Sequence, residues 1–167
     1  GINMLYEKDI EINPEALDVE WLEQGPLALK YSRYAAQAAS EVRRLEEIKK
    51  TIRSELILEV NQNPGELIGK DKPNAGDIEA YYRNHERYKE IVQRLLDAQE
   101  EAEFAEAAKN EICYTRKKAL EMLVQLHGQQ YFAGPRVPRN LTEEWEQRQR
   151  QKKADSGIAS KMKRRRE

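Results

Sequence analysis

Residues 85–127 are the most constraining feature of the sequence, because they repeat one side-chain pattern without a glycine or a proline. Small or apolar residues recur at alternating steps of three and four, the spacing of one face of a coiled-coil helix. The positions of this seam are Tyr88, Ile91, Leu95, Ala98, Ala102, Ala105, Lys109, Ile112, Arg116, Ala119, Leu123 and Leu126. The alanines permit a close helix approach. Lys109 and Arg116 interrupt the seam, so we do not expect a uniform zipper.

A second long helix is predicted from residue 26 to about residue 60, where proline occurs only at the first position. Its apolar stripe has the same helical spacing and consists of Tyr31, Tyr34, Ala38, Val42, Leu45, Ile48, Ile52 and Leu56. Residues 61–76 contain three glycines, two prolines and three asparagines and are predicted to be a loop. A short helical piece is expected at 77–83, with Asn84 as a cap for the next helix. Two long helices joined in this way favour an antiparallel hairpin.

The N-terminal residues precede this hairpin and are rich in acids, since residues 1–25 carry seven acids and one base. Residues 4–13 are predicted to be extended or irregular. Asn13-Pro14 predicts a helix start, with asparagine as the cap and proline in the first turn. A short helix is therefore expected from 14 to about 24, ending at Gly25-Pro26.

The C-terminal residues are basic, with eleven bases against five acids over residues 136–167. Thr142 is predicted to cap a helix that reaches about Lys153. From Ala154 onward we expect disorder in the free protein, because the segment is polar and highly charged. A basic end on a more neutral body is typical of an interaction tail.

Together these patterns predict an all-α protein built on a long antiparallel two-helix hairpin with coiled-coil-like packing. We expect three segments. They are an N-terminal arm and short helix (1–25), a hairpin that serves as the oligomerisation domain (26–133), and a basic, partly disordered C-terminal tail (134–167).

The composition limits the class of protein. Charged residues make up 35% of the 167 residues and aromatic residues 7%, which is too polar for one deep core. Long helices that bury one stripe fit this composition, and such helices often complete their core by forming a homo-oligomer. No apolar run approaches a membrane span, and no signal peptide is expected. The single Cys113 excludes an intrachain disulfide and is expected in a reducing cytoplasm.

No catalytic motif stands out in the sequence. There is no phosphate-binding loop, no dinucleotide-binding glycine pattern and no zinc-ligand set. His85 and His127 lie 42 residues apart, and each is interpreted as a surface or helix-end residue. The carboxylate pairs occur on charged helical faces that offer no pocket to perturb an acid. We therefore predict a protein that is not an enzyme, with no catalytic residue, no metal and no cofactor.

Two basic clusters are the candidate binding features. The first lies on the first long helix and consists of Arg43, Arg44, Lys49, Lys50 and Arg53. The second is at the C-terminus and consists of Lys161, Lys163, Arg164, Arg165 and Arg166. Both can hold the phosphates of single-stranded DNA without reading sequence. The tail has another interpretation as a solubilising segment.

The helix cluster also has a second interpretation. Folding the hairpin would bring Arg43, Arg44 and Lys49 near the acidic run Glu100–Glu106, which favours intramolecular salt bridges. For Arg43 and Arg44 we favour this interpretation, whereas for Lys49, Lys50 and Arg53 the two are equally weighted. Tyr31 and Tyr34 could stack on bases, although their helical spacing favours core packing.

Residues 12–56 resemble the N-terminal part of the UvsY family of phage recombination mediators. The matching positions are Ile12-Asn13-Pro14, Leu17, Glu20, Leu22, Leu27, Lys30-Tyr31, Leu45-Glu46 and Lys49-Lys50-Thr51-Ile52-Arg53. The sequence departs from the family at the end of the helix. Residues 60–65 replace a Tyr-Tyr-Ser-Gly-like turn, and Ser54 and Leu56 stand where the family has DNA-contacting basic residues.

The resemblance implies a function in DNA recombination and DNA repair. Mediators of this kind form homo-oligomeric rings, bind single-stranded DNA, and help a RecA-like recombinase replace the single-strand-binding protein. A modest basic patch on each subunit suffices in a ring, because many weak contacts add up. The resemblance places the protein in the cytoplasm of a phage-infected bacterium. The alternative is a helical scaffold, adaptor or phage assembly chaperone whose basic tail binds a protein partner.

Overall fold

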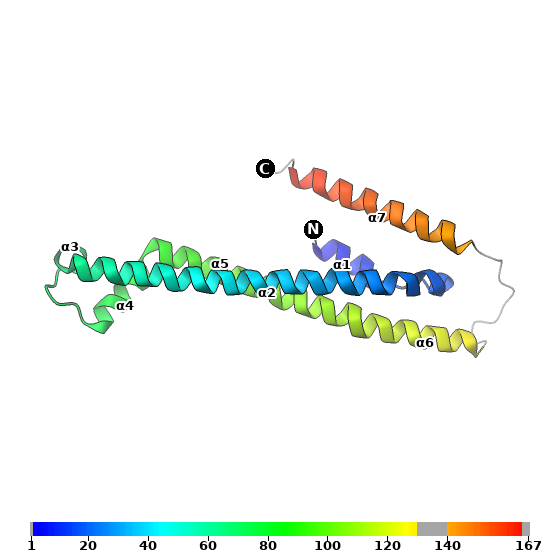
Figure 1. Cartoon of the computed structure of the whole chain (residues 1–167), viewed down its shortest axis with the longest axis horizontal. Coiled ribbons are helices and arrows are strands. Elements are labelled where there is room, and N and C mark those ends of the chain that lie inside the picture. The colour runs from blue at the N-terminus through cyan, green and yellow to red at the C-terminus, as the bar shows by residue number, and fades with distance from the viewer. Residues whose placement is uncertain (1, 130–139, 165–167) are drawn as a thin grey trace. The chain divides into compact units, whose positions relative to one another are not determined.

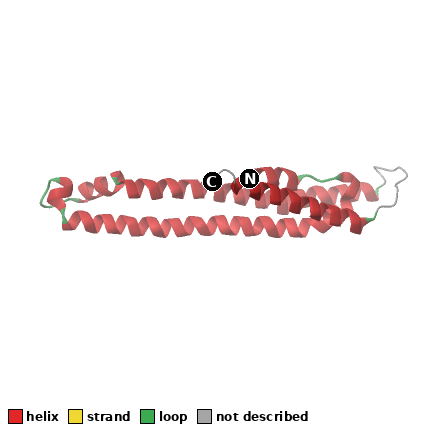
Figure 2. Cartoon of the chain, turned by 90° about the horizontal axis from the view of Figure 1, so that it is seen from above, coloured by secondary structure: helices red, strands yellow, loops and turns green. Residues whose placement is uncertain are grey.

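The computed structural model describes residues 2–129 and 140–164, and every regular element in these ranges is a helix (Figures 1 and 2). The elements are α1 (Ile2–Ile10), the 3₁₀ turn η1 (Pro14–Ala16), α2 (Leu17–Gln62), α3 (Pro64–Ile68), α4 (Ala75–Asn84), α5 (Glu86–Asn110), the π-helical turn η2 (Glu111–Arg116), α6 (Lys117–Gly128) and α7 (Leu141–Arg164). The all-α prediction is confirmed. None of the described helices is long and apolar enough to cross a membrane.

The chain divides into two compact units, and in each of them the long helices pack antiparallel. The first unit contains residues 1–31 and 108–167, and the second contains residues 32–107. The predicted antiparallel hairpin is therefore confirmed.

In the second unit, α2 and the α4–α5 segment bury the predicted stripe against the predicted seam. Three clusters follow one another along the helices. They are Ala35, Ala38 and Ala105; Leu45, Ile91 and Leu95; and Leu56, Tyr82 and Tyr88. Residue numbers rise on α2 as they fall on its partner, which defines the antiparallel register. The alanine cluster is where small side chains let the two backbones approach.

The connection between these helices is more ordered than the loop predicted over 61–76. Pro64 begins the short helix α3, and Gly69 ends it with a left-handed φ of 69°. Asn74 then caps α4. Its side chain accepts a hydrogen bond from the Asp77 amide at 2.8 Å, and its own amide donates to the Asp77 carboxylate at 3.1 Å.

The sequence predicts Asn84 as the cap of α5, but the cap is His85. The Asn84 side chain donates back to the Ala80 carbonyl at 2.7 Å, so it belongs to the end of α4. His85 Nδ1 accepts a hydrogen bond from the Arg87 amide at 3.2 Å. Both residues can cap a helix, and the extended backbone at His85 decides which one does.

In the first unit, α2 runs through Gly25-Pro26, where the sequence predicted a break. Asn13 does cap the 3₁₀ turn before it, since its side chain accepts from the Glu15 amide at 2.9 Å. Contacts with the partner helix on both sides of the proline hold α2 together. The Gln24 amide donates to the Ile112 carbonyl at 2.8 Å, and Ala28 contributes a carbonyl to the Cys113 thiol at 4.0 Å. Those contacts offset the hydrogen bond that Pro26 cannot donate.

Residues 2–10 form helix α1, whereas residues 4–13 were predicted to be irregular. Asp9 explains the difference, because it is buried and bound from α2. Its carboxylate lies 2.5 Å from Lys30 Nζ and accepts a hydrogen bond from the Tyr31 hydroxyl at 3.0 Å. The Tyr6 ring packs edge-on against the Tyr31 ring at 5.9 Å. Helix α1 is therefore stabilised by tertiary contacts, which the local sequence pattern does not predict.

The π-helical turn at 111–116 changes which side chains the second long helix buries. A π-helical turn contains more residues than an α-helical turn. Side chains four residues apart therefore lie on the same face here, and the alternating steps of three and four no longer apply. The buried residues of this stretch are Ala108, Ile112, Arg116 and Leu120. Leu120 thus takes the inward position predicted for Ala119, which is exposed.

Helix α7 begins at Leu141 and runs to Arg164, beyond the helix predicted to end near Lys153. Asn140 caps it, since its side chain accepts from the Glu143 amide at 3.3 Å. Its residues are mostly good helix formers, and Gly157 is the single glycine within it. Residues 130–139 and 165–167 lie outside the described residues.

Candidate functional site

The five basic residues predicted on the first long helix all lie on α2 within the second unit, but they differ in their partners. Arg44 lies 2.6 Å from Glu41, and Lys50 lies 2.7 Å from Glu47, each three residues away on the same helix. The hydrogen bond that each cation donates to its carboxylate raises the pKa of the cation. These two cations are therefore already paired, although the pairs are exposed and weak.

Lys49 and Arg53 lie one turn apart and face tyrosine rings. Lys49 Nζ is 6.0 Å from the centre of the Tyr88 ring, and Arg53 Cζ is 5.1 Å from the centre of the Tyr82 ring. The hydrogen bond with Tyr82 raises the pKa of Arg53. Within the described residues, neither cation forms an ion pair with a carboxylate. We call this pair the tyrosine-backed cations.

The two tyrosines are core residues. Tyr82 and Tyr88 are 7% and 9% exposed and pack edge-on at 5.1 Å. Their rings therefore face the charged ends of Lys49 and Arg53 and are not available to stack on bases. Tyr31 is also buried, in the first unit, which agrees with the core interpretation.

The expected salt bridges from Arg43, Arg44 and Lys49 to Glu100–Glu106 do not form. The apolar clusters set a register in which Glu101 faces Tyr34, whose hydroxyl donates to its carboxylate. Burial and this hydrogen bond raise the pKa of Tyr34. Arg44 pairs within its own helix, and no ion pair of Arg43 occurs in the described part of the chain. Packing of the stripe decides the register, because exposed ion pairs are too weak to shift it.

The C-terminal cluster is described in part. Lys161, Lys163 and Arg164 lie in the last turns of α7, whereas Arg165 and Arg166 lie outside the described residues. Their contact with DNA remains a prediction.

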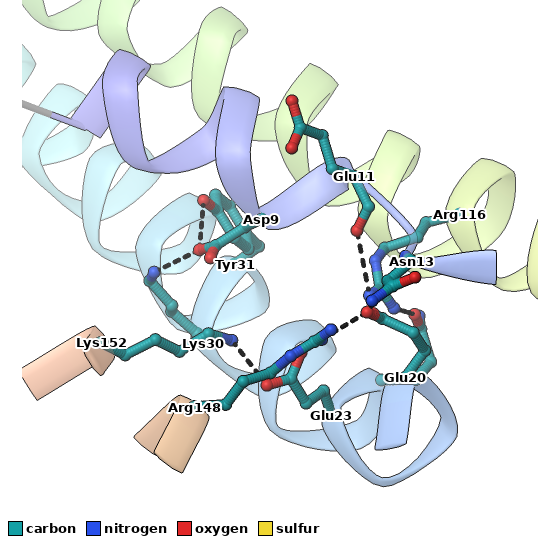
Figure 3. Close-up of polar contacts among 11 residues, drawn as sticks. Asp9, Glu11, Asn13, Glu20, Glu23, Lys30, Tyr31, Arg116, Arg148 and Lys152 are labelled. Carbon is teal, nitrogen blue, oxygen red and sulfur yellow. Dashed lines mark hydrogen bonds and ion pairs between the residues drawn. The ribbon is translucent and has the colours of Figure 1, made fainter. Parts of the chain in front are cut away.

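A buried charge network in the first unit is the feature that sequence reasoning missed (Figure 3). Its centre is Arg116, 2% exposed, in the π-helical turn. Arg116 Nη2 donates to the Glu20 carboxylate, and Nη1 donates to Gln24 Oε1 at 2.6 Å. Nη2 also lies 3.4 Å from the Glu11 carbonyl. The sequence did contain one indication of this network, namely Arg116 within the apolar seam. A buried arginine needs an acid opposite it.

Helix α7 extends this network. Arg148 donates to Glu20 and, at 3.1 Å, to Glu23 Oε2. Lys152 Nζ lies 3.3 Å from Glu23 Oε1, as an ion pair without hydrogen-bond geometry. Burial opposes the charge on Arg148, but the hydrogen bonds and charges of Glu20 and Glu23 outweigh it and raise its pKa.

A cavity of about 450 Å³ lies beside the network, lined by residues of α1, α2 and α7. Its lining residues include both acids and bases, among them Asp9, Glu23, Lys30 and Lys152. Most of these groups are paired with one another, and the described residues contain no cluster of three or more metal-ligand side chains. Among the described residues, this arrangement joins α1, α2 and α7 through opposite charges.

No protein-family model, curated protein or solved structure matches this chain.

Proposed function

We propose that this protein binds single-stranded DNA without sequence preference and acts as a recombination mediator. In that role it helps load a RecA-like recombinase onto strands coated by single-strand-binding protein. The observation that carries the proposal is the pair of tyrosine-backed cations, Lys49 and Arg53, one turn apart on α2 and free of carboxylate partners in the described residues. The resemblance of residues 12–56 to the mediators supports the same conclusion.

The proposal rests on the energetics of phosphate binding. A cation that is already paired must leave its carboxylate before it contacts a phosphate, whereas Lys49 and Arg53 need not. Their charged ends already lie over buried rings, so less side-chain freedom is lost on binding. Each cation that neutralises a phosphate of a single strand contributes about 0.7 to the slope of log K against log salt. Binding should therefore be electrostatic, salt-sensitive and indifferent to sequence.

Self-association is part of the proposal, because two cations per chain bind weakly. Leu22 and Leu29 support it. They are 55% and 53% exposed and lie seven residues apart on one side of α2. Two exposed leucines at this spacing are suited to packing against another helix. Repeating the cations around an oligomer would multiply their affinity without new contacts.

The test is binding to labelled oligo-dT by fluorescence anisotropy over a range of salt concentrations. The variant is Lys49→Met with Arg53→Met, since methionine keeps an apolar stem without the charge. The control is Arg44→Met with Lys50→Met, which removes the same charge from cations that are already paired. Arg44 and Arg53 are nine residues apart, and therefore point to opposite sides of the helix.

The expected result is a salt slope that falls by about 1.4 in the first variant, or roughly 25-fold weaker binding at 0.1 M salt. The control should lose much less. Equal losses in both variants would show that only net charge matters, and no binding by the unaltered protein at low salt would remove the proposal. Loading is then assayed by the ATP hydrolysis of a RecA-like recombinase on strands coated by single-strand-binding protein.

A further inference from the structure

Glu23 differs from the other carboxylate of the buried network in where its partners come from. Glu20 is bound by Arg116 of the long-helix pair and by Arg148 of α7. The Glu23 side chain is 4% exposed, and within the described residues its ion-pair partners are Arg148 and Lys152, both on α7. When α7 is docked, Glu23 is therefore a buried acid neutralised by this helix.

A buried carboxylate without a cation is unfavourable, so Glu23 is stable in this position only with a basic segment beside it. Glu20 and Glu23 carry two negative charges, and Arg116 compensates one. Arg148 and Lys152 bring two positive charges, which is more than the remaining one requires. We call the surface formed by Glu20 and Glu23 the carboxylate cleft.

Over residues 141–157, the described contacts of α7 include ion pairs with both α1 and α2. Its further ion pair with α1, between Lys8 and Asp155, is 4.0 Å long and half open to solvent. From Leu141 to Gly157 the single aromatic residue is Trp145, which is half-buried. The Lys8–Asp155 pair is therefore screened by salt, whereas the buried carboxylates of Glu20 and Glu23 are screened less. Arg148 and Lys152 themselves are 30% and 40% exposed, so another anion can reach them.

We propose that the carboxylate cleft is a docking site for the basic face of α7, and that single-stranded DNA competes with it for Arg148 and Lys152. Carboxylates and phosphates bind arginine through the same charge-assisted hydrogen bonds. The docked helix thus withholds two phosphate-binding cations until a nucleic acid strand displaces the carboxylates. This inference rests on the proposed DNA binding for the identity of the competitor, but not for the docking itself.

The test uses the full chain with Glu23→Gln, which keeps the shape of the side chain and removes its charge. The matched control is Glu146→Gln, since Glu146 pairs with Arg150 at 3.2 Å on the exposed side of α7. Hydrogen exchange of the α7 amides measures docking without DNA. We expect Glu23→Gln to lose protection over residues 141–157 and the control to keep it. Arg148→Gln with Lys152→Gln should release α7 from the other side of the same contact.

Oligo-dT binding then measures the competition. Freeing two cations should raise the salt slope by about 1.4, an increase in affinity of up to roughly 25-fold at 0.1 M salt. The increase should exceed that of Glu146→Gln and disappear in the triple variant that also carries Arg148→Gln and Lys152→Gln.

Each outcome decides one part of the inference. Unchanged exchange of α7 both in Glu23→Gln and in the variant with Arg148→Gln and Lys152→Gln overturns the docking site. Release of α7 with no gain over the control, or a gain that survives in the triple variant, overturns the competition. If neither the unaltered protein nor Glu23→Gln binds oligo-dT, the competition and the proposed function both fail. The exchange data still decide whether the carboxylate cleft holds α7.

Discussion

Replacing Arg116 with methionine would test whether the buried charge network stabilises the first unit. The Arg116 side chain is 1% exposed and the Glu20 side chain 2% exposed, so neither charge is solvated in the folded protein. The substitution removes charge-assisted hydrogen bonds to Glu20 and Gln24. Such bonds contribute about 1.5–3 kcal/mol each. Breaking a buried pair typically costs about 3–5 kcal/mol, because the remaining charge is left uncompensated.

The expected loss is at the low end of this range, about 3 kcal/mol, since Glu20 retains two partners. Arg148 still binds it, and the Asn13 amide still donates to it at 3.2 Å. If the free energy of unfolding falls by about 2 kcal/mol per M urea, the urea concentration at the unfolding midpoint should be lower by about 1.5 M. Circular dichroism at a fixed protein concentration measures it, because self-association makes stability depend on concentration.

The control is Arg94→Met, which removes an exposed arginine from α5 and should change stability by no more than about 0.5 kcal/mol. A second variant, Arg116→Met with Glu20→Met and Gln24→Leu, removes the polar groups together and should recover most of the loss. A midpoint for Arg116→Met that matches the control would refute the reasoning that a buried ion pair holds this unit together.

Two further predictions concern α2. Pro26→Ala should raise the thermal unfolding midpoint, because residue 26 is exposed in a helix interior and alanine can donate the missing hydrogen bond. The expected gain in unfolding free energy is about 1–3 kcal/mol. A lower midpoint would mean that the proline is needed for the shape of α2. Leu22→Gln with Leu29→Gln should lower the mass seen by sedimentation while helicity is retained, because these side chains are the two exposed leucines; an unchanged mass would exclude this face from self-association.

Much of the second unit was predictable because its information is local. The stripe from Ala38 to Leu56 and the seam from Tyr88 to Ala105 repeat at helical spacing, and burial follows that spacing closely. The turn residues were also informative, because Pro64 and Gly69 act through their own backbones and Asn74 acts through a side chain that bonds three residues along the chain.

The candidate sites were only partly predictable. Lys49 and Arg53 were visible as a basic cluster, but their separation from Arg44 and Lys50 depends on which neighbour each side chain finds. Arg116 was visible as an interruption of the seam. Its partners Glu20 and Gln24 are more than ninety residues away in the chain, and no local pattern connects them.

Apolar spacing and capping residues act over a few positions, and they were enough to predict the two long helices, their antiparallel pairing and the residues buried in the second unit. Three features became visible only in the folded chain: α2 continues through Pro26, residues 2–10 are helical, and α7 is held by Glu20 and Glu23. One cause underlies all three. A proline, an acid or a basic helix can take more than one conformation or partner, and contacts from distant parts of the chain select among them.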